Sequence, residues 1–251
     1  MLLFSMLILG AVIGFVGAGG AGVTIALLTA GFDVPIHTAL AVALASMVFT
    51  MISGTISHFR EGEVVLKTGA ILGFGGVFGA LIGAECAEFI PAALLSYLTG
   101  GMLLLSAIIL YIKVYRESVL NKYLPPRKEP LAGKKLYVYG IIFGFINGFL
   151  SGAFGIGAAA FIQLTLMVVF GVPILQSIGT CMMVVLPISM AGSVAYIFNG
   201  FLDFSIFIQT LAGLMVGAFI GAKFTHLAPR PFLKACIVLL PMTGALTILL
   251  K

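Results

Sequence analysis

The stretch GFVGAGGAG, Gly14 to Gly22, decides the fold together with a second stretch, GFINGFLSGAFGIG, Gly144 to Gly157. Each lies in the middle of a long apolar run, residues 1–31 and 136–171. Glycine inside a helix costs about 1 kcal/mol relative to alanine, so five glycines in nine residues predict a break. At membrane depth, a break is tolerated only where protein or a water-filled cavity covers the freed backbone groups. The half-helix after each break would present unpaired N–H groups to the interior, which suits an anion.

The composition excludes an ordinary soluble domain. Hydrophobic residues make up 61% of the chain and charged residues 8%, against about 25% charged residues in soluble proteins. Several long apolar runs predict membrane-spanning helices, and therefore an all-α polytopic membrane protein. The net charge of +5 is carried by loops beside the membrane, so it does not indicate nucleic-acid binding. The widely spaced Cys86, Cys181 and Cys236 are interpreted as small hydrophobic residues.

The two halves of the chain are copies of one unit. Residues 1–112 form the first repeat, residues 113–135 a linker with seven Lys or Arg, and residues 136–251 the second repeat. An offset of 138 aligns the VPI turns that begin at Val34 and Val172, whereas the broken runs align at an offset nearer 134. Three spans are expected after each broken run: residues 38–57, 68–84 and 92–112 in the first half, and residues 175–197, 204–222 and 232–250 in the second.

Charge predicts the orientation of the repeats. The positive-inside rule places the basic linker in the cytoplasm. Counting spans from there leaves the acidic loop 85–91 outside, whereas its counterpart, the loop 223–234, carries cations and suits the inside. We therefore expect inverted repeats, each a glycine-broken re-entrant hairpin followed by three transmembrane helices. Each leg of the second hairpin should hold about 15 residues, which is too short for a hydrocarbon core of about 30 Å.

The candidate anion site lies at the hairpin tips and on the helices beside them. Backbone N–H groups and uncharged side-chain donors would replace the hydration of an oxyanion there. The predicted substrate-binding residues are Gly17, Gly19, Gly20, Gly22, Thr24, Ser46, Thr50, Asn147, Ser151, Gly152, Gly155, Gly157, Gln163 and Thr180. The alternative is that the glycines only let helices pack closely and that the hydroxyls satisfy their own helix carbonyls. Packing is the predicted role of Gly75, Gly79 and Gly83, which recur at every fourth residue.

The spans carry no clear Asp, Glu, Lys or Arg, so the sequence predicts no proton relay. It also shows no pairing of a nucleophile with a base and no cluster of metal ligands. We therefore expect neither an enzyme nor a protein that holds a cofactor or a metal.

A family resemblance rests on an ordered set of features. The two glycine-rich segments lead to VPI turns, Gly54 and Gly192 stand late in the next helix, and the second half carries the loop Gly200-Phe201-Leu202-Asp203. Over essentially the whole chain, this set resembles the TauE/SafE family of sulfite exporters. The resemblance implies a multi-pass protein of the bacterial inner membrane that moves sulfite, sulfonates or similar small sulfur oxyanions.

The expected function is therefore export of such an anion. Each negative charge that leaves a cell whose interior is negative by about 100 mV gains about 2.3 kcal/mol, so export needs no coupled ion. The expected partners are the small anion and the lipid bilayer, without nucleic acid, and a homo-oligomer is compatible with the sequence. Three alternatives stay open: an anion or small-solute channel, an uptake permease coupled to H+ or Na+, and a structural membrane protein.

Overall fold

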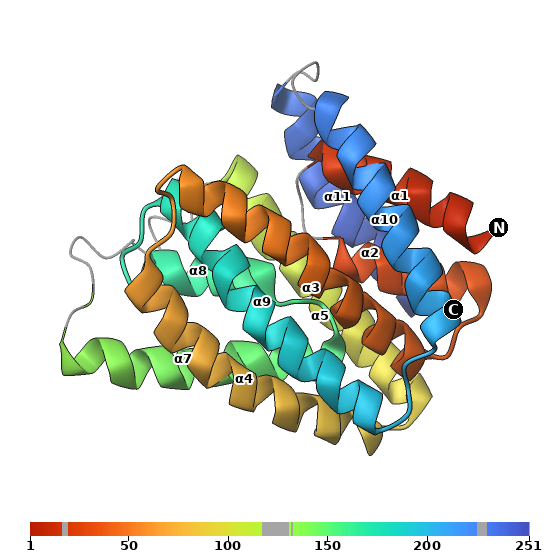
Figure 1. Cartoon of the computed structure of the whole chain (residues 1–251), viewed down its shortest axis with the longest axis horizontal. Coiled ribbons are helices and arrows are strands. Elements are labelled where there is room, and N and C mark those ends of the chain that lie inside the picture. Colours follow the sequence, from red (N-terminus) through yellow and green to blue (C-terminus); the bar gives the residue numbers. More distant parts are fainter. Residues whose placement is uncertain (17–19, 117–130, 132, 225–229, 251) are drawn as a thin grey trace.

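The computed structural model describes residues 1–16, 20–116, 131, 133–224 and 230–250. Every regular element among them is a helix. In the first half these are α1 (Leu2–Val16), α2 (Ala21–Ala26), the π-helix η1 (Leu27–Gly31), α3 (Ile36–Arg60), α4 (Leu66–Glu88) and α5 (Ala92–Tyr115). In the second half they are α7 (Lys134–Phe154), α8 (Ala159–Val168), α9 (Ile174–Phe198), α10 (Phe204–Phe224) and α11 (Arg230–Leu249). Figure 1 shows their arrangement.

Five of the described helices, α3, α4, α5, α7 and α9, are long and apolar enough to cross a membrane. Large apolar side chains stand on their outer surfaces, where Phe74 of α4 is 61% exposed and Tyr97 of α5 is 58% exposed. Such exposure is unfavourable in water but suits contact with lipid. The all-helical, polytopic part of the fold prediction is therefore confirmed.

The break of the second hairpin lies nearer the end of its apolar run than the sequence indicated. In the second half, α7 runs for 21 residues to Phe154 and α8 for only 10, in place of two legs of equal length. The glycines at 144, 148 and 152 do not interrupt α7. The chain turns only over residues 155–158, where Gly155, Gly157 and Ala158 have φ angles of 63°, 67° and 46°.

One offset, 138, relates the two halves throughout, so the expected offset of 134 for the broken runs is wrong. The first legs end at Val16 and Phe154, and the second legs begin at Ala21 and Ala159. The turns match as well, because Val34 N–H donates to Leu28 O and Val172 N–H to Leu166 O, both at 3.0 Å.

Glycines bring helices of different halves into backbone contact. Side chains at Gly75, Gly79 and Gly83 of α4 would collide with carbonyl groups of α7, and those at Gly213 and Gly217 of α10 with the backbone of α1. The predicted packing role of the α4 glycines is confirmed. The molecule therefore contains two tight pairs, α4 with α7 and α1 with α10, each built from both halves (Figure 1).

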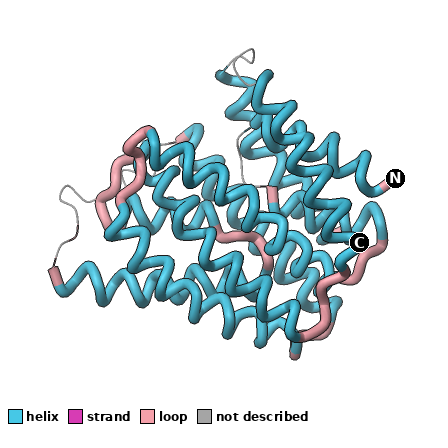
Figure 2. Tube along the Cα trace, in the orientation of Figure 1, coloured by secondary structure: helices cyan, strands magenta, loops and turns pink. Residues whose placement is uncertain are grey.

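Equivalent loops lie at opposite ends of the helices. The loop between α3 and α4 stands at one end, and its counterpart between α9 and α10 stands at the other (Figures 1 and 2). At the second end, His37 Nε2 lies 3.1 Å from Ala87 O and its ring stacks on Phe201 at 4.9 Å. We call this the acidic end, because Asp33, Glu85, Glu88 and Asp203 are exposed there. The opposite, basic end carries exposed Arg60, Lys67, Lys134 and Lys135.

Candidate functional site

The tip of the second hairpin reaches the place where α3 crosses α9. A side chain at Gly155 would come within 2.5 Å of Leu40, and one at Gly157 within 2.5 Å of Met47. Met47 belongs to a buried cluster that also includes Ala21, the first residue of α2, and Ala158. Both breaks therefore face the same central region of the molecule.

The half-helices after the breaks begin without side-chain caps. The N-cap residues are Gly20 for α2 and Ala158 for α8, and neither residue has a side-chain acceptor. The first helical hydrogen bonds are Thr24 N–H to Gly20 O and Ile162 N–H to Ala158 O, each at 2.9 Å. The amides of the residues before Thr24 and Ile162 consequently have no acceptor within their own helices. They point positive partial charge at the tips.

Ser151 supplies a free hydroxyl in the last turn of α7, just before the break. It lies one turn after Asn147 on the same face of α7, and Asn147 Nδ2 donates to Thr165 Oγ1 of α8 at 3.2 Å. This contact joins the two legs of the second hairpin. The Ser151 side chain is 0% exposed, and its Oγ has no hydrogen-bond partner among the described residues.

Two more buried hydroxyls stand on the helices that cross at the tip. Ser46 of α3 is 1% exposed and Ser189 of α9 is 0% exposed, and each Oγ lacks a partner in the described part of the chain. Ser189 lies between Val185 and Gly192 on its helix. Gly192 approaches Leu44 and the Cα of Gly152. An unpaired buried hydroxyl costs about 1–3 kcal/mol, so these serines are suited to meet a guest.

The polar groups are concentrated in the second hairpin. With the offset of 138, its polar residues Asn147, Ser151, Gln163 and Thr165 correspond to Leu9, Ile13, Ile25 and Leu27 of the first hairpin. Ile25 is fully buried, and Ile13 packs against Gly20 at the start of α2. The central region therefore has a polar hairpin on one side and an apolar hairpin on the other.

Several predicted site residues prove to be committed elsewhere. The Thr24 hydroxyl donates to Gly20 O at 2.9 Å and the Thr50 hydroxyl to Met47 O at 2.9 Å, so both bond to their own helices. Thr180 accepts the Val65 N–H at 2.9 Å. Gly152 lies inside α7, where it packs against Ala80 of α4 and accepts the Tyr196 hydroxyl at 3.1 Å.

The remaining predicted residues lie as follows. Gly155 donates its N–H to Ser151 O at 2.8 Å and closes α7, and Gly157 stands at the tip. Gly22 packs against Leu103 of α5, and Gln163 is half-buried in α8. Gly17 and Gly19 fall outside the described residues. The predicted set omitted Ser189 and Thr165. With the offset of 138, Thr165 could have been found, because it is polar where the first repeat has the apolar Leu27.

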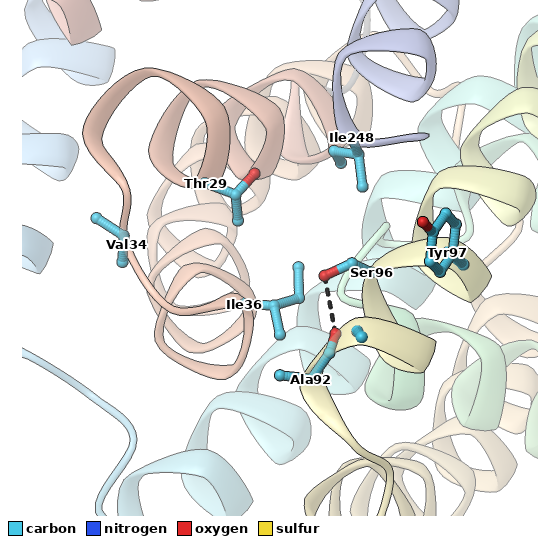
Figure 3. Close-up of a pocket in the computed structure, with 8 residues that line it drawn as sticks. Thr29, Val34, Ile36, Ala92, Ser96, Tyr97 and Ile248 are labelled. Atoms are coloured by element: carbon cyan, nitrogen blue, oxygen red, sulfur yellow. Dashed lines mark hydrogen bonds between the residues drawn. The ribbon is translucent and has the colours of Figure 1, made fainter. Parts of the chain in front are cut away.

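A separate cavity of about 280 Å³ opens at the acidic end (Figure 3). Thr29 of η1, Ile36 of α3 and Ile248 of α11 line it, and Ser96 and Tyr97 of α5 form its polar side. The Ser96 hydroxyl donates to Ala92 O at 2.9 Å. Its walls are mostly apolar, and none of the predicted substrate-binding residues lines it.

Three possible metal ligands, unexpected from the sequence, meet where the last turn of α3 runs into the loop before α4. The ligand atoms of His58, Glu61 and Glu63 lie within 4.8 Å of one another. His58 Nδ1 and Glu63 Oε2 are 2.7 Å apart and form an ion pair when the histidine is protonated. The pair holds the turn closed at the basic end of the molecule.

Comparison with known proteins identifies the family. The profile described as "Sulfite exporter TauE/SafE" matches residues 2–248. The chain is 44% identical over 249 residues to "Probable membrane transporter protein YdhB" of Bacillus subtilis (strain 168), covering 99% of both chains. It is 26% identical to "Probable membrane transporter protein YjnA" of the same organism, covering 93% of this chain and 94% of the relative. No solved structure matches the chain. The chain therefore belongs to the TauE/SafE family and is a membrane transporter, not an enzyme.

Proposed function

We propose that the protein is a permease for a small sulfur oxyanion, sulfite or an organosulfonate, which binds where the hairpin tips meet α3 and α9. The observation that carries the proposal is the buried, unpartnered Ser151 hydroxyl in the last turn of α7, just before the break after which α8 begins without a side-chain cap. Helix amides and hydroxyl groups donate hydrogen bonds to an anion without a full positive charge nearby. Such a site favours binding that is weak enough to permit release.

The unequal hairpins favour an anion with a compact charged head. Asn147, Ser151 and Thr165 would surround the head from the second hairpin, with Ser189 facing it from α9. Leu9 and Ile13 of the first hairpin offer an apolar surface that fits the carbon body of a sulfonate. Sulfite would use the polar half alone.

We further propose that the repeats are inverted across the inner membrane, with the basic end and the linker in the cytoplasm. The opposite placement of equivalent loops supports this topology, as does the gathering of the exposed cations Arg60, Lys67, Lys134 and Lys135 at one end. The membrane potential then favours export, at about 2.3 kcal/mol per charge for 100 mV. The runners-up are an anion channel and uptake coupled to H+ or Na+.

The test is binding and flux in proteoliposomes with sulfite, sulfoacetate, taurine, sulfate and thiosulfate. Ser151→Ala should raise the Kd of the bound anion about tenfold or more, because a hydrogen bond to a charged group contributes about 1.5–3 kcal/mol. Ser193→Ala is the matched control, since that hydroxyl already donates to Met190 O at 2.9 Å on the same helix as Ser189. An unchanged Kd in Ser151→Ala would remove the proposed site, and flux that never saturates would favour the channel.

A further inference from the structure

Helix α4 carries a second set of glycines, which closes its contact with α9. Gly69 meets Thr180 and Met183, Gly73 meets Pro187 and Val184, and Gly76 meets Ile188. We call this contact the α4–α9 seam. Its residues pack closely because the three glycines place no side chains between the helices.

The equivalent contact, between α10 and α3, cannot close in this way. The offset of 138 puts Phe207, Leu211 and Leu214 of α10 where α4 has Gly69, Gly73 and Gly76. We call this contact the α3–α10 seam. Its bulky side chains hold the two helices apart, whereas Gly213 and Gly217 still keep α10 against α1.

The α3–α10 seam is filled by large side chains. The Phe207 ring of α10 contacts the ring of Phe49 on α3, with 6.3 Å between the centroids. The offset of 138 pairs Phe49 with Pro187 of α9, which meets Gly73 of α4. Aromatic side chains therefore lie in the α3–α10 seam where glycines close the α4–α9 seam.

The α3–α10 seam carries polar groups where the other seam is apolar. Ser46 and Thr50 of α3 correspond to Val184 and Ile188 of α9, the residues that face Gly73 and Gly76. Ser46 is 1% exposed with an unpartnered Oγ, whereas Val184 is 0% exposed in an apolar contact. The α3–α10 seam therefore holds an unpartnered hydroxyl at the position where the α4–α9 seam has an apolar side chain.

From these differences we infer that the α3–α10 seam is the anion's route between the tip site and the membrane surface, and that the α1–α10 pair slides on α3 to open it. Helices α3, α4, α7 and α9 remain a fixed frame, because the glycines of α4 close its contacts with both α7 and α9. Ser46 is then a transit contact rather than part of the resting site. The inference rests on the proposed function, and it adds which seam opens and which helices move.

The first test asks which seam admits water, with no need for a transported anion. In a variant without native cysteines, Ser46→Cys and Val184→Cys place one thiol at equivalent positions of the two seams. A membrane-impermeant methanethiosulfonate that carries a sulfonate group should modify the thiol at position 46 at least about tenfold faster than that at position 184. Equal rates, or faster reaction at position 184, would overturn the inference.

The second test locks each seam in turn. A flexible bifunctional thiol reagent applied to the double variant Phe49→Cys with Phe207→Cys should stop anion flux while equilibrium binding persists. The control pair is Val65→Cys with Thr180→Cys, at the start of α4 and on α9, where the Val65 backbone N–H lies 2.9 Å from Thr180 Oγ1. Crosslinking this pair should leave flux near that of its uncrosslinked form. Loss of flux only in the control pair would show that the α4–α9 seam moves, and it would overturn the inference.

Failure of the proposed function gives a different pattern. If the tip does not bind a sulfur oxyanion, Ser151→Ala leaves the Kd unchanged, but the contrast between thiols at positions 46 and 184 persists. If only the route is wrong, Ser151→Ala still weakens binding and the two thiols react alike.

Discussion

The side-chain amide of Asn147 on α7 donates to the hydroxyl of Thr165 on α8 at 3.2 Å and also to Phe143 O at 2.8 Å. One residue therefore joins the two legs of the second hairpin about one turn below the free Ser151 hydroxyl. The first hairpin has Leu9 and Leu27 at the equivalent positions and cannot form this bond. The amide thus fixes where the α8 N-terminus stands relative to Ser151.

This contact predicts coupling between Asn147 and Thr165. Asn147→Leu and Thr165→Val should each weaken anion binding, because each releases α8 from α7. The double variant should be hardly worse than either single one, with a coupling energy of about 0.5–3 kcal/mol. The measurement is the anion Kd of the four proteins. Thr247→Val on α11 is the control, since that hydroxyl donates only to Thr243 O of its own helix, and additive losses at 147 and 165 would contradict the prediction.

The sequence predicted the helices well because glycine, proline and charged residues mark the ends of the apolar segments. It missed the register of the broken runs for a physical reason. A stripe of glycines at every fourth residue superposes on itself after a shift of four, so Gly10 aligns with Gly144 as readily as with Gly148. Only the helix ends settle the offset, which places Gly10 on Gly148 at equivalent contacts with α10 and α4.

The predicted site residues include hydroxyls of two kinds, because residue type does not reveal whether a hydroxyl is free. Thr24 and Thr50 bond to their own helices, whereas Ser46 and Ser151 lack partners among the described residues, and all four are hydroxyl residues in apolar runs. The choice depends on the side-chain rotamer and on the neighbouring helix. Comparing the two repeats at the offset of 138 is more informative than residue type alone, because it shows which polar residues occur in only one hairpin.

Two glycines with positive φ angles, one at the tip and one in a distant loop, should differ in their effect on transport but not on stability. Gly157 has φ +67° and lies against Met47, whereas Gly200 has φ +73° in a loop with open space around it. Alanine at either position adds about 1–2 kcal/mol of left-handed strain. Both Gly157→Ala and Gly200→Ala should lower the midpoint of thermal unfolding in detergent. Only Gly157→Ala should also reduce anion flux, and equal flux in the two variants would separate the tip from transport.

Because α4 and α7 approach closely, adding a single methyl group between them should lower the free energy of unfolding substantially. A Cβ at Gly79 would collide with the carbonyl oxygen of Phe145, and a backbone atom cannot rotate away. Gly79→Ala should therefore destabilise the protein by about 1–3 kcal/mol. Gly101→Ala in α5 is the matched change, because nothing lies within 4 Å of its Cβ, and it should be neutral or stabilise by up to about 1 kcal/mol. Thermal unfolding of both variants in the same detergent checks the sign.

Thr180 was predicted to contact the substrate, but its observed hydrogen bond gives it a structural role. Its hydroxyl is fully buried and accepts the Val65 N–H at 2.9 Å, which ties the start of α4 to α9. Thr180→Val leaves that N–H without an acceptor and should cost about 1–3 kcal/mol of stability, with little change in the anion Kd. Thr180→Ser restores the acceptor and should recover most of the loss. The contrary result would be a Kd raised as much as in Ser151→Ala with an unchanged midpoint of thermal unfolding. The Thr180 hydroxyl would then belong to the anion site, and the glycine contacts alone would hold α4 against α9.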